Sequence, residues 1–213
     1  MRPGQAMRLA LRDFYANSWR LLLVNAAVGT VLVAAILAAL AFPLALVLVV
    51  AVGPFAAALV HCAVTLVRTG NLELGDALEG LRLHWRRGLV LAASGCVLAL
   101  LAVVALRAYG GSGLWPLAFL SSYVLVLLGI YGLVVWTLGV AEPDRSLRSI
   151  AHEAAQLSAT RPGATLVLGL GLLVVNIVGI ATAVMPFLTL TIAYTFLAVA
   201  HFVLPPPVTE ETV

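Results

Sequence analysis

Charge is what this 213-residue sequence has least of. Lysine is absent, all twelve basic residues are arginine, and charged residues make up 10% of the chain against 63% hydrophobic residues. Four stretches contain no charged residue: 21–67, 88–106, 108–141 and 162–209. A soluble domain carries far more charge, and a helix needs about 20 apolar residues to cross a membrane. The composition excludes a soluble globular protein and predicts an all-α integral membrane protein, and arginine without lysine indicates a GC-rich bacterial genome.

The apolar stretches contain no acidic residue, and the two cysteines of the chain lack the spacing of a metal site. The chain also has neither an HExxH motif nor a nucleophile elbow. Proton-coupled carriers usually use carboxylates embedded in the membrane, so a carrier of that kind and an enzyme are both disfavoured. Cys62 and Cys96 lie inside apolar stretches without zinc-ligand spacing. We therefore expect no catalytic residue, no metal site, no disulfide and no cofactor.

Proline divides the apolar stretches into six spans. Pro43 and Pro186 lie in mid-stretch, where a residue without a backbone N–H makes a natural corner between two helices. Gly53-Pro54 lies inside the second span, where we expect a kink rather than a break. We expect one membrane domain over residues 1–204 and a short cytoplasmic tail at 205–213. The spans are predicted at about 21–42, 44–67, 88–106, 116–140, 164–184 and 187–204.

The arginines predict the direction of these spans. Eleven of the twelve precede the first span or lie between spans two and three or four and five, and only Arg107 lies on the other side. Basic residues in short loops stay on the cytoplasmic side. We therefore expect a multi-pass protein of the bacterial inner membrane with both termini in the cytoplasm. The arginines do not form one patch, so nucleic acid is not an expected partner.

Each cytoplasmic segment also has the pattern of an amphipathic helix lying at the membrane interface. The six spans would then form three hairpins, each preceded by such a helix. Arg20, Arg87 and Arg161 mark equivalent points, 67 and 74 residues apart, which indicates a threefold internal repeat. The same rhythm arises in any hairpin protein that obeys the charge rule, so both interpretations stay open. In the second segment, one helical face would carry Leu74, Ala77, Leu78, Leu81 and Trp85.

One part of the sequence resembles a known family. The segment Asp13-Phe14-Tyr15-Ala16-Asn17-Ser18-Trp19-Arg20-Leu21 is followed by Asn25, by Gly53-Pro54 and by the amphipathic segment 72–87. Together these residues resemble the YesL-like family of uncharacterised bacterial membrane proteins, most clearly over residues 10–90. The resemblance implies six spans. It also implies an accessory role near sugar uptake, because some members are encoded beside carbohydrate ABC transporters. It assigns no functional residue.

Four polar residues within the spans are candidate ligand-binding residues: His61, His201, Asn25 and Asn176. An ionisable side chain is costly inside a membrane, and His61 and His201 at equivalent repeat positions could face a shared inner cavity. Alternatively, each histidine is neutral and bonded to a neighbouring carbonyl or to the interface, and each asparagine makes a hydrogen bond between helices.

These patterns favour a non-catalytic accessory or assembly protein. We expect it to lie in the lipid bilayer and to bind an ABC transporter subunit or another membrane protein. The alternative is a subunit that binds or transports a small solute, resembling the six-span substrate-capture subunits of vitamin importers. The interfacial residues expected to form the partner surface are Trp19, Arg20, Trp85, Arg86, Arg87, Glu153 and Arg161.

Overall fold

The computed structural model describes residues 1–42, 46–182 and 190–204, and these residues form helices and no strand. Five helical segments are long and apolar enough to cross a membrane, which agrees with the expected all-α, multi-pass membrane protein. The corner at Pro43 and the first residues of the sixth predicted span lie outside the described residues. The helices are α1 (Pro3–Ala16), α2 (Ser18–Ala41), α3 (Leu46–Val50), α4 (Gly53–Thr69), α5 (Leu74–Gly111), α6 (Trp115–Ala141), α7 (Leu147–Thr160), α8 (Pro162–Thr182) and α10 (Ile192–Val203).

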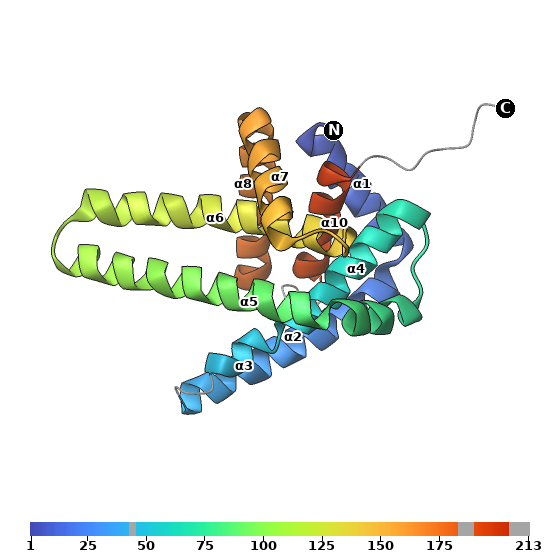
Figure 1. Ribbon diagram of the computed structural model, residues 1–213, viewed down its shortest axis with the longest axis horizontal. Coiled ribbons are helices and arrows are strands. Elements are labelled where there is room, and N and C mark those ends of the chain that lie inside the picture. The colour runs from blue at the N-terminus through green and yellow to red at the C-terminus, as the bar shows by residue number, and fades with distance from the viewer. Residues whose placement is uncertain (43–45, 183–189, 205–213) are drawn as a thin grey trace.

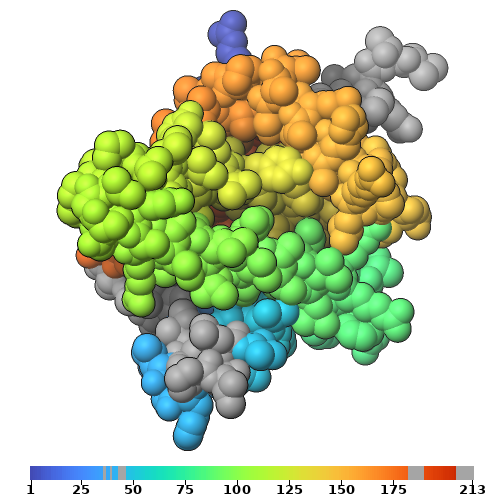
Figure 2. Space-filling model, turned by 60° about the vertical axis from the view of Figure 1, so that its left-hand side comes forward, coloured from blue at the N-terminus to red at the C-terminus, as the bar shows by residue number. Residues whose placement is uncertain are grey.

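Two helices form the centre of the molecule and one hairpin projects from it. Most residues of α4 and α10 are buried, and α10 packs against α1, α4 and α6. α5 and α6 form a long hairpin that extends away from this centre, and α8 and α10 run crosswise to the hairpin (Figure 1). The hairpin lies in front in Figure 2. Its outer half exposes large apolar side chains such as Leu100 and Phe119, as expected of a surface that faces lipid.

The second predicted span is interrupted by a tight turn, and its two helical pieces together form Val47–Thr69, one of the five segments long enough to cross a membrane. Ala51 and Val52 form a turn between α3 and α4, in which each backbone N–H donates to the carbonyl three residues earlier. Pro54 has no N–H to continue the helix. It lies instead in the first turn of α4, where a missing donor costs nothing because that N–H would have no partner.

The predicted boundary between an amphipathic helix at 72–87 and a span at 88–106 is absent. α5 is a single helix of 38 residues. It starts with a capping box in which the Glu73 backbone N–H donates to Asp76 Oδ2 at 2.8 Å. Gly88 does not end the helix, because one glycine costs only about 1 kcal/mol. Without a side chain it also allows close contact with α4.

That contact runs along an antiparallel pair of helices. α4 ends at Gly70, whose φ of 73° favours glycine, and the chain turns back into α5. Gly53 packs on Gly88 at one end of the pair, and His61 packs on Gly80 nearer the turn. A Cβ at Gly88 would lie 2.6 Å from the Gly53 carbonyl oxygen. The absence of side chains therefore sets the distance between these two helices.

Candidate functional site

α1 and α10 are joined by a partly buried hydrogen bond between a carboxylate and an imidazole. Asp13, in the last turn of α1, accepts a hydrogen bond at Oδ2 from His201 Nε2, in the last turn of α10, at 2.9 Å. The residues are 188 positions apart, and His201 is 8% exposed. Ala6 and Ala10 are fully buried and let α1 approach α10 closely. The Tyr194 hydroxyl adds a hydrogen bond to a backbone carbonyl of α1, at 3.1 Å.

Asp13 and His201 line a cavity of about 340 Å³ between α1 and the C-terminal ends of α4 and α10. The cavity is also lined by Arg12, Arg68 and Thr69. Arg12 Nε lies 3.3 Å from Asp13 Oδ1, so the carboxylate has two partners. This mixture of one carboxylate, one imidazole and two guanidinium groups suits a small polar solute with an anionic group. The Thr69 hydroxyl is engaged with backbone carbonyls, so the geometry favours binding over nucleophilic chemistry.

His61 has a different partner. Its Nδ1 lies 3.3 Å from Nε2 of His84, which is buried on α5, and the ring centroids are 5.2 Å apart. A Cβ at Gly80 would lie 2.7 Å from the Cβ of His61, so a glycine is needed beside this ring. The cavity lined by His201 does not include His61. His61 and His201 therefore do not share this cavity. His61 contacts His84, and His201 contacts Asp13.

Asn25 and Asn176 also occupy separate places. Asn25 is fully buried in α2. Asn176 Nδ2 donates to the Leu172 carbonyl and to Thr195 Oγ1, both at 2.8 Å, and so connects α8 with α10. This is the hydrogen bond between helices that was the alternative to ligand binding.

Arginines bind the C-terminal end of α6. Arg87 donates to the carbonyls of Gly139 at 2.7 Å and Glu142 at 2.9 Å, and also to that of Arg145. Arg68 donates to a fourth carbonyl at 3.1 Å. The last carbonyls of a helix have no partner within it and form the negative end of its dipole. Arg87, expected at a partner surface, therefore holds α5 to α6 inside the molecule.

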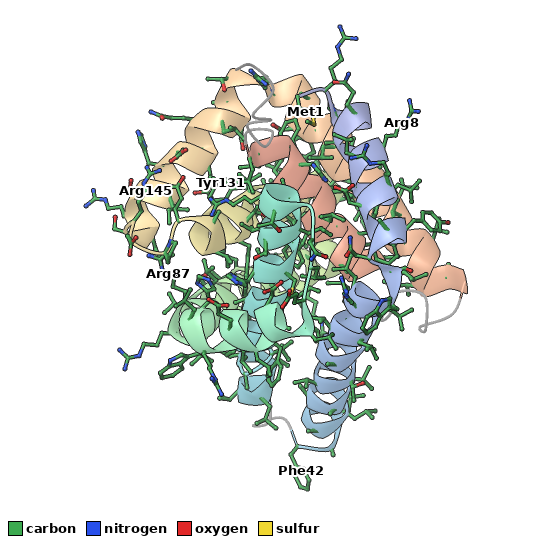
Figure 3. The ribbon with its side chains drawn as sticks, turned by 90° about the vertical axis from the view of Figure 1, so that its right-hand side faces the viewer. Met1, Arg8, Phe42, Arg87, Tyr131 and Arg145 are labelled. Carbon is green, nitrogen blue, oxygen red and sulfur yellow. The ribbon has the colours of Figure 1, made fainter. Side chains whose placement is uncertain are left out.

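Arg145 extends this cluster to α7. It forms ion pairs at 2.5 Å with Glu142 and with Glu153. The hydrogen bonds that Arg145 donates to Glu142 and Glu153 raise its pKa above the ordinary value. Arg87, Arg145 and Tyr131 can be followed in Figure 3, and the Tyr131 hydroxyl donates to a carbonyl of α7 at 2.8 Å. Glu153 is thus occupied within the chain and is not a free partner residue.

Two tryptophan–arginine pairs remain on the surface. Trp19 is 55% and Trp85 47% exposed. The guanidinium carbons of Arg20 and Arg86 lie 5.2 and 5.1 Å from the centroids of their neighbouring tryptophan rings. Arg20 also donates to the side chain of Asn71 at 3.1 Å, which brings the start of α2 to the turn before α5. We call Trp19, Arg20, Trp85 and Arg86, with the exposed Leu78 and Leu83 of α5, the tryptophan–arginine surface.

The amphipathic face expected over residues 72–87 contributes to this surface. Leu78 and Trp85 point outward, whereas Gly80 and His84 are buried against α4. Arg161, expected at the partner surface, is exposed at the end of α7. The three arginines of the proposed repeat therefore make different contacts: Arg20 with an asparagine and Arg87 with backbone carbonyls, while Arg161 lies in the open.

The sequence did not identify the partners of His61 and His201, which are His84 and Asp13. Asp13 was placed only within the family-like segment, and His84 was not singled out. Both lie on segments that were predicted to be amphipathic, one turn or less from an arginine, and that position was the available signal. Within the described ranges, no group of three or more His, Cys, Asp or Glu side chains could hold a metal ion.

Comparisons with protein families, with curated proteins and with solved structures find no match to this chain. The resemblance to the YesL-like family therefore stays a prediction, and the functional argument rests on geometry.

Proposed function

We propose that the chain crosses the bacterial inner membrane six times, in three hairpins, with both termini in the cytoplasm. Five long apolar helices support this topology, and the 12-residue apolar helix α10 lies within the sixth span predicted from the sequence. The one-sided distribution of arginine supports the orientation. The threefold repeat would relate the hairpins, each preceded by a cytoplasmic helical segment.

We further propose that the protein is a non-catalytic accessory subunit that holds a membrane partner at the tryptophan–arginine surface. One observation carries this proposal. Leu78, Leu83 and Trp85 stay exposed beside Arg82 and Arg86, although this part of α5 already buries another face against α4. Tryptophan and arginine are enriched at the centres of protein interfaces. The complementary partner presents apolar and acidic side chains, and the YesL-like resemblance favours an ABC transporter subunit.

Site-specific photocrosslinking in intact membranes tests this proposal. A photoreactive amino acid at Leu78, which is 62% exposed, should give one discrete crosslinked product with a membrane protein. The matched control is Val104, 57% exposed on the outer half of the same helix, where only lipid should be labelled. Trp85→Ala should weaken the Leu78 product, and the same partner should co-purify in mild detergent. Products at both positions, or at neither, would refute a specific surface.

A second candidate function rests on the cavity of Asp13 and His201. A partly buried carboxylate–imidazole pair beside two arginines would suit a polar solute in such a subunit. We expect a polar solute bound there to raise the melting temperature, by about 2.7 kcal/mol of stabilisation at a concentration of 100 times its Kd. His201→Ala should remove the effect. If a panel of sugars, vitamins and organic anions leaves the melting temperature of the native protein unchanged, the accessory role alone remains.

A further inference from the structure

A second, larger cavity lies between α6, α8 and α10. Its volume is about 520 Å³, within the range of roughly 300–1,000 Å³ that small-ligand sites occupy. Gly129 makes room for it, whereas the space beside Gly169 is filled by the Ile130 side chain. A Cβ at Gly129 would meet no atom within 4 Å, and Gly169 lies directly against Ile130. The lining is apolar except for Asn176 and Thr195.

The hydrogen bonds fix how Asn176 presents its amide. Leu172 offers a backbone carbonyl, which only accepts, so the amide nitrogen must be the atom that faces it. The second N–H goes to Thr195 Oγ1, whose own hydrogen is donated to the Thr191 carbonyl at 2.7 Å. Asn176 Oδ1 accepts no hydrogen bond from any residue that the structure describes. Asn176, which lines the cavity, therefore keeps one acceptor with capacity for a donor.

The lining also determines what can enter. No charged side chain lines the cavity, so an ionised headgroup there would lose its hydration without a counter-charge. Leu173 lines the cavity and is partly exposed, and its neighbours Val174 and Ile177 on α8 are exposed apolar residues. In a membrane such a rim contacts hydrocarbon rather than water. The entrance is thus open to molecules dissolved in the bilayer.

We propose that this cavity binds the hydrocarbon chain of an uncharged lipid alcohol, whose hydroxyl donates to Asn176 Oδ1. The chain fills the space beside Gly129, and the hydroxyl satisfies the remaining acceptor. This site is separate from the tryptophan–arginine surface and from the cavity of Asp13 and His201. Its success or failure is therefore independent of both functions proposed above.

Photolabelling with matched probes tests the proposal on the full chain in lipid nanodiscs. The probes are hexadecanol with a diazirine in its chain and the methyl ether of the same molecule, which cannot donate a hydrogen bond. We expect the alcohol to label α6, α8 and α10 at the cavity about fivefold more than the ether, the effect of one net hydrogen bond. Equal labelling of the native protein by both probes, or labelling confined to the tip of the α5–α6 hairpin, would overturn the proposed binding site.

Two glycine variants locate the bound chain. Gly129→Leu should fill the cavity and abolish specific labelling by the alcohol. Gly132→Leu is the matched control, because it lies on the same helix, also meets no atom within 4 Å, and does not line this cavity. It should label like the native protein. If the alcohol labels both variants equally, its hydrocarbon chain binds elsewhere.

Two polar variants separate ligand binding from helix packing. Asn176→Leu should reduce labelling by the alcohol to the level of the ether. Thr195→Val removes the same hydrogen bond between α8 and α10 but keeps Asn176 Oδ1, so it should retain the preference for the alcohol. Loss of that preference in Thr195→Val and not in Asn176→Leu would contradict the proposed acceptor.

Discussion

The contact between Gly53 and Gly88 gives the sharpest test of how α4 and α5 are held together. In Gly88→Ala the new methyl group would lie 2.6 Å from the Gly53 carbonyl oxygen, 2.8 Å from its carbonyl carbon and 2.9 Å from Pro54 Cα. Ordinary carbon contacts lie at about 3.5–4.0 Å. All three atoms belong to the backbone and have no rotamer to change, so the helices themselves must separate.

The size of the effect follows from two opposing contributions. Overpacking costs about 1–3 kcal/mol, and a backbone contact belongs at the upper end. Alanine is a better helix former than glycine and offsets about 1 kcal/mol. The free energy of unfolding should therefore fall by about 2 kcal/mol, which lowers the melting temperature of a chain of this length by about 4–8 °C.

Thermal unfolding in detergent, followed by circular dichroism, measures this shift. Gly95→Ala is the matched control, because it lies seven residues further along α5 and its Cβ would meet no atom within 4 Å. That variant should melt at the same temperature as the native protein or slightly higher. If Gly88→Ala and Gly95→Ala melt together, the close approach of α4 and α5 does not exist and the reasoning fails.

Three other contacts give shorter predictions, all measured by the same unfolding assay. Arg87→Ala should cost about 1.5–3 kcal/mol because charged hydrogen bonds to α6 are lost, whereas Arg86→Ala should cost under about 1 kcal/mol; equal losses would contradict the inward role of Arg87. A double-mutant cycle with Asp13→Ala and His201→Ala should give a coupling of about 0.5–3 kcal/mol, and additive effects would refute their contact. Tyr131→Phe should cost about 1 kcal/mol, the net value of its hydrogen bond to α7, and an unchanged melting temperature would count against that bond.

Arginine contacts at the C-terminal end of α6 join helices that follow one another in the chain. Arg68 and Arg87 come from the α4–α5 pair, and both donate to carbonyls of α6. Arg145 then connects the end of α6 to Glu153 on α7. Three consecutive parts of the chain are therefore joined by guanidinium groups on one side of the molecule. Positions that a topology rule counts as cytoplasmic charge also serve as structural contacts.

Local composition determined what the sequence could predict. Whether a segment forms an apolar helix depends mainly on its own residues, so the helical class and the long apolar segments followed from residue type. The position of Leu78 and Trp85 on one helical face also followed from helical periodicity. The exact place of the turn at Ala51-Val52 did not, because the neighbouring helices decide where a span bends next to a proline.

Only the tertiary structure decided which residues meet. Asp13 and His201 are 188 residues apart, and nothing in the spacing of either residue identifies the other as its partner. His84 could be assigned to His61 only after Gly53 and Gly88 had fixed the register of α4 against α5. Hydrophobic burial is nondirectional and depends on each segment alone, whereas a hydrogen bond or a glycine contact requires two particular surfaces at a particular distance. The sequence of this protein therefore determined its helices, and packing determined its cavities and ion pairs.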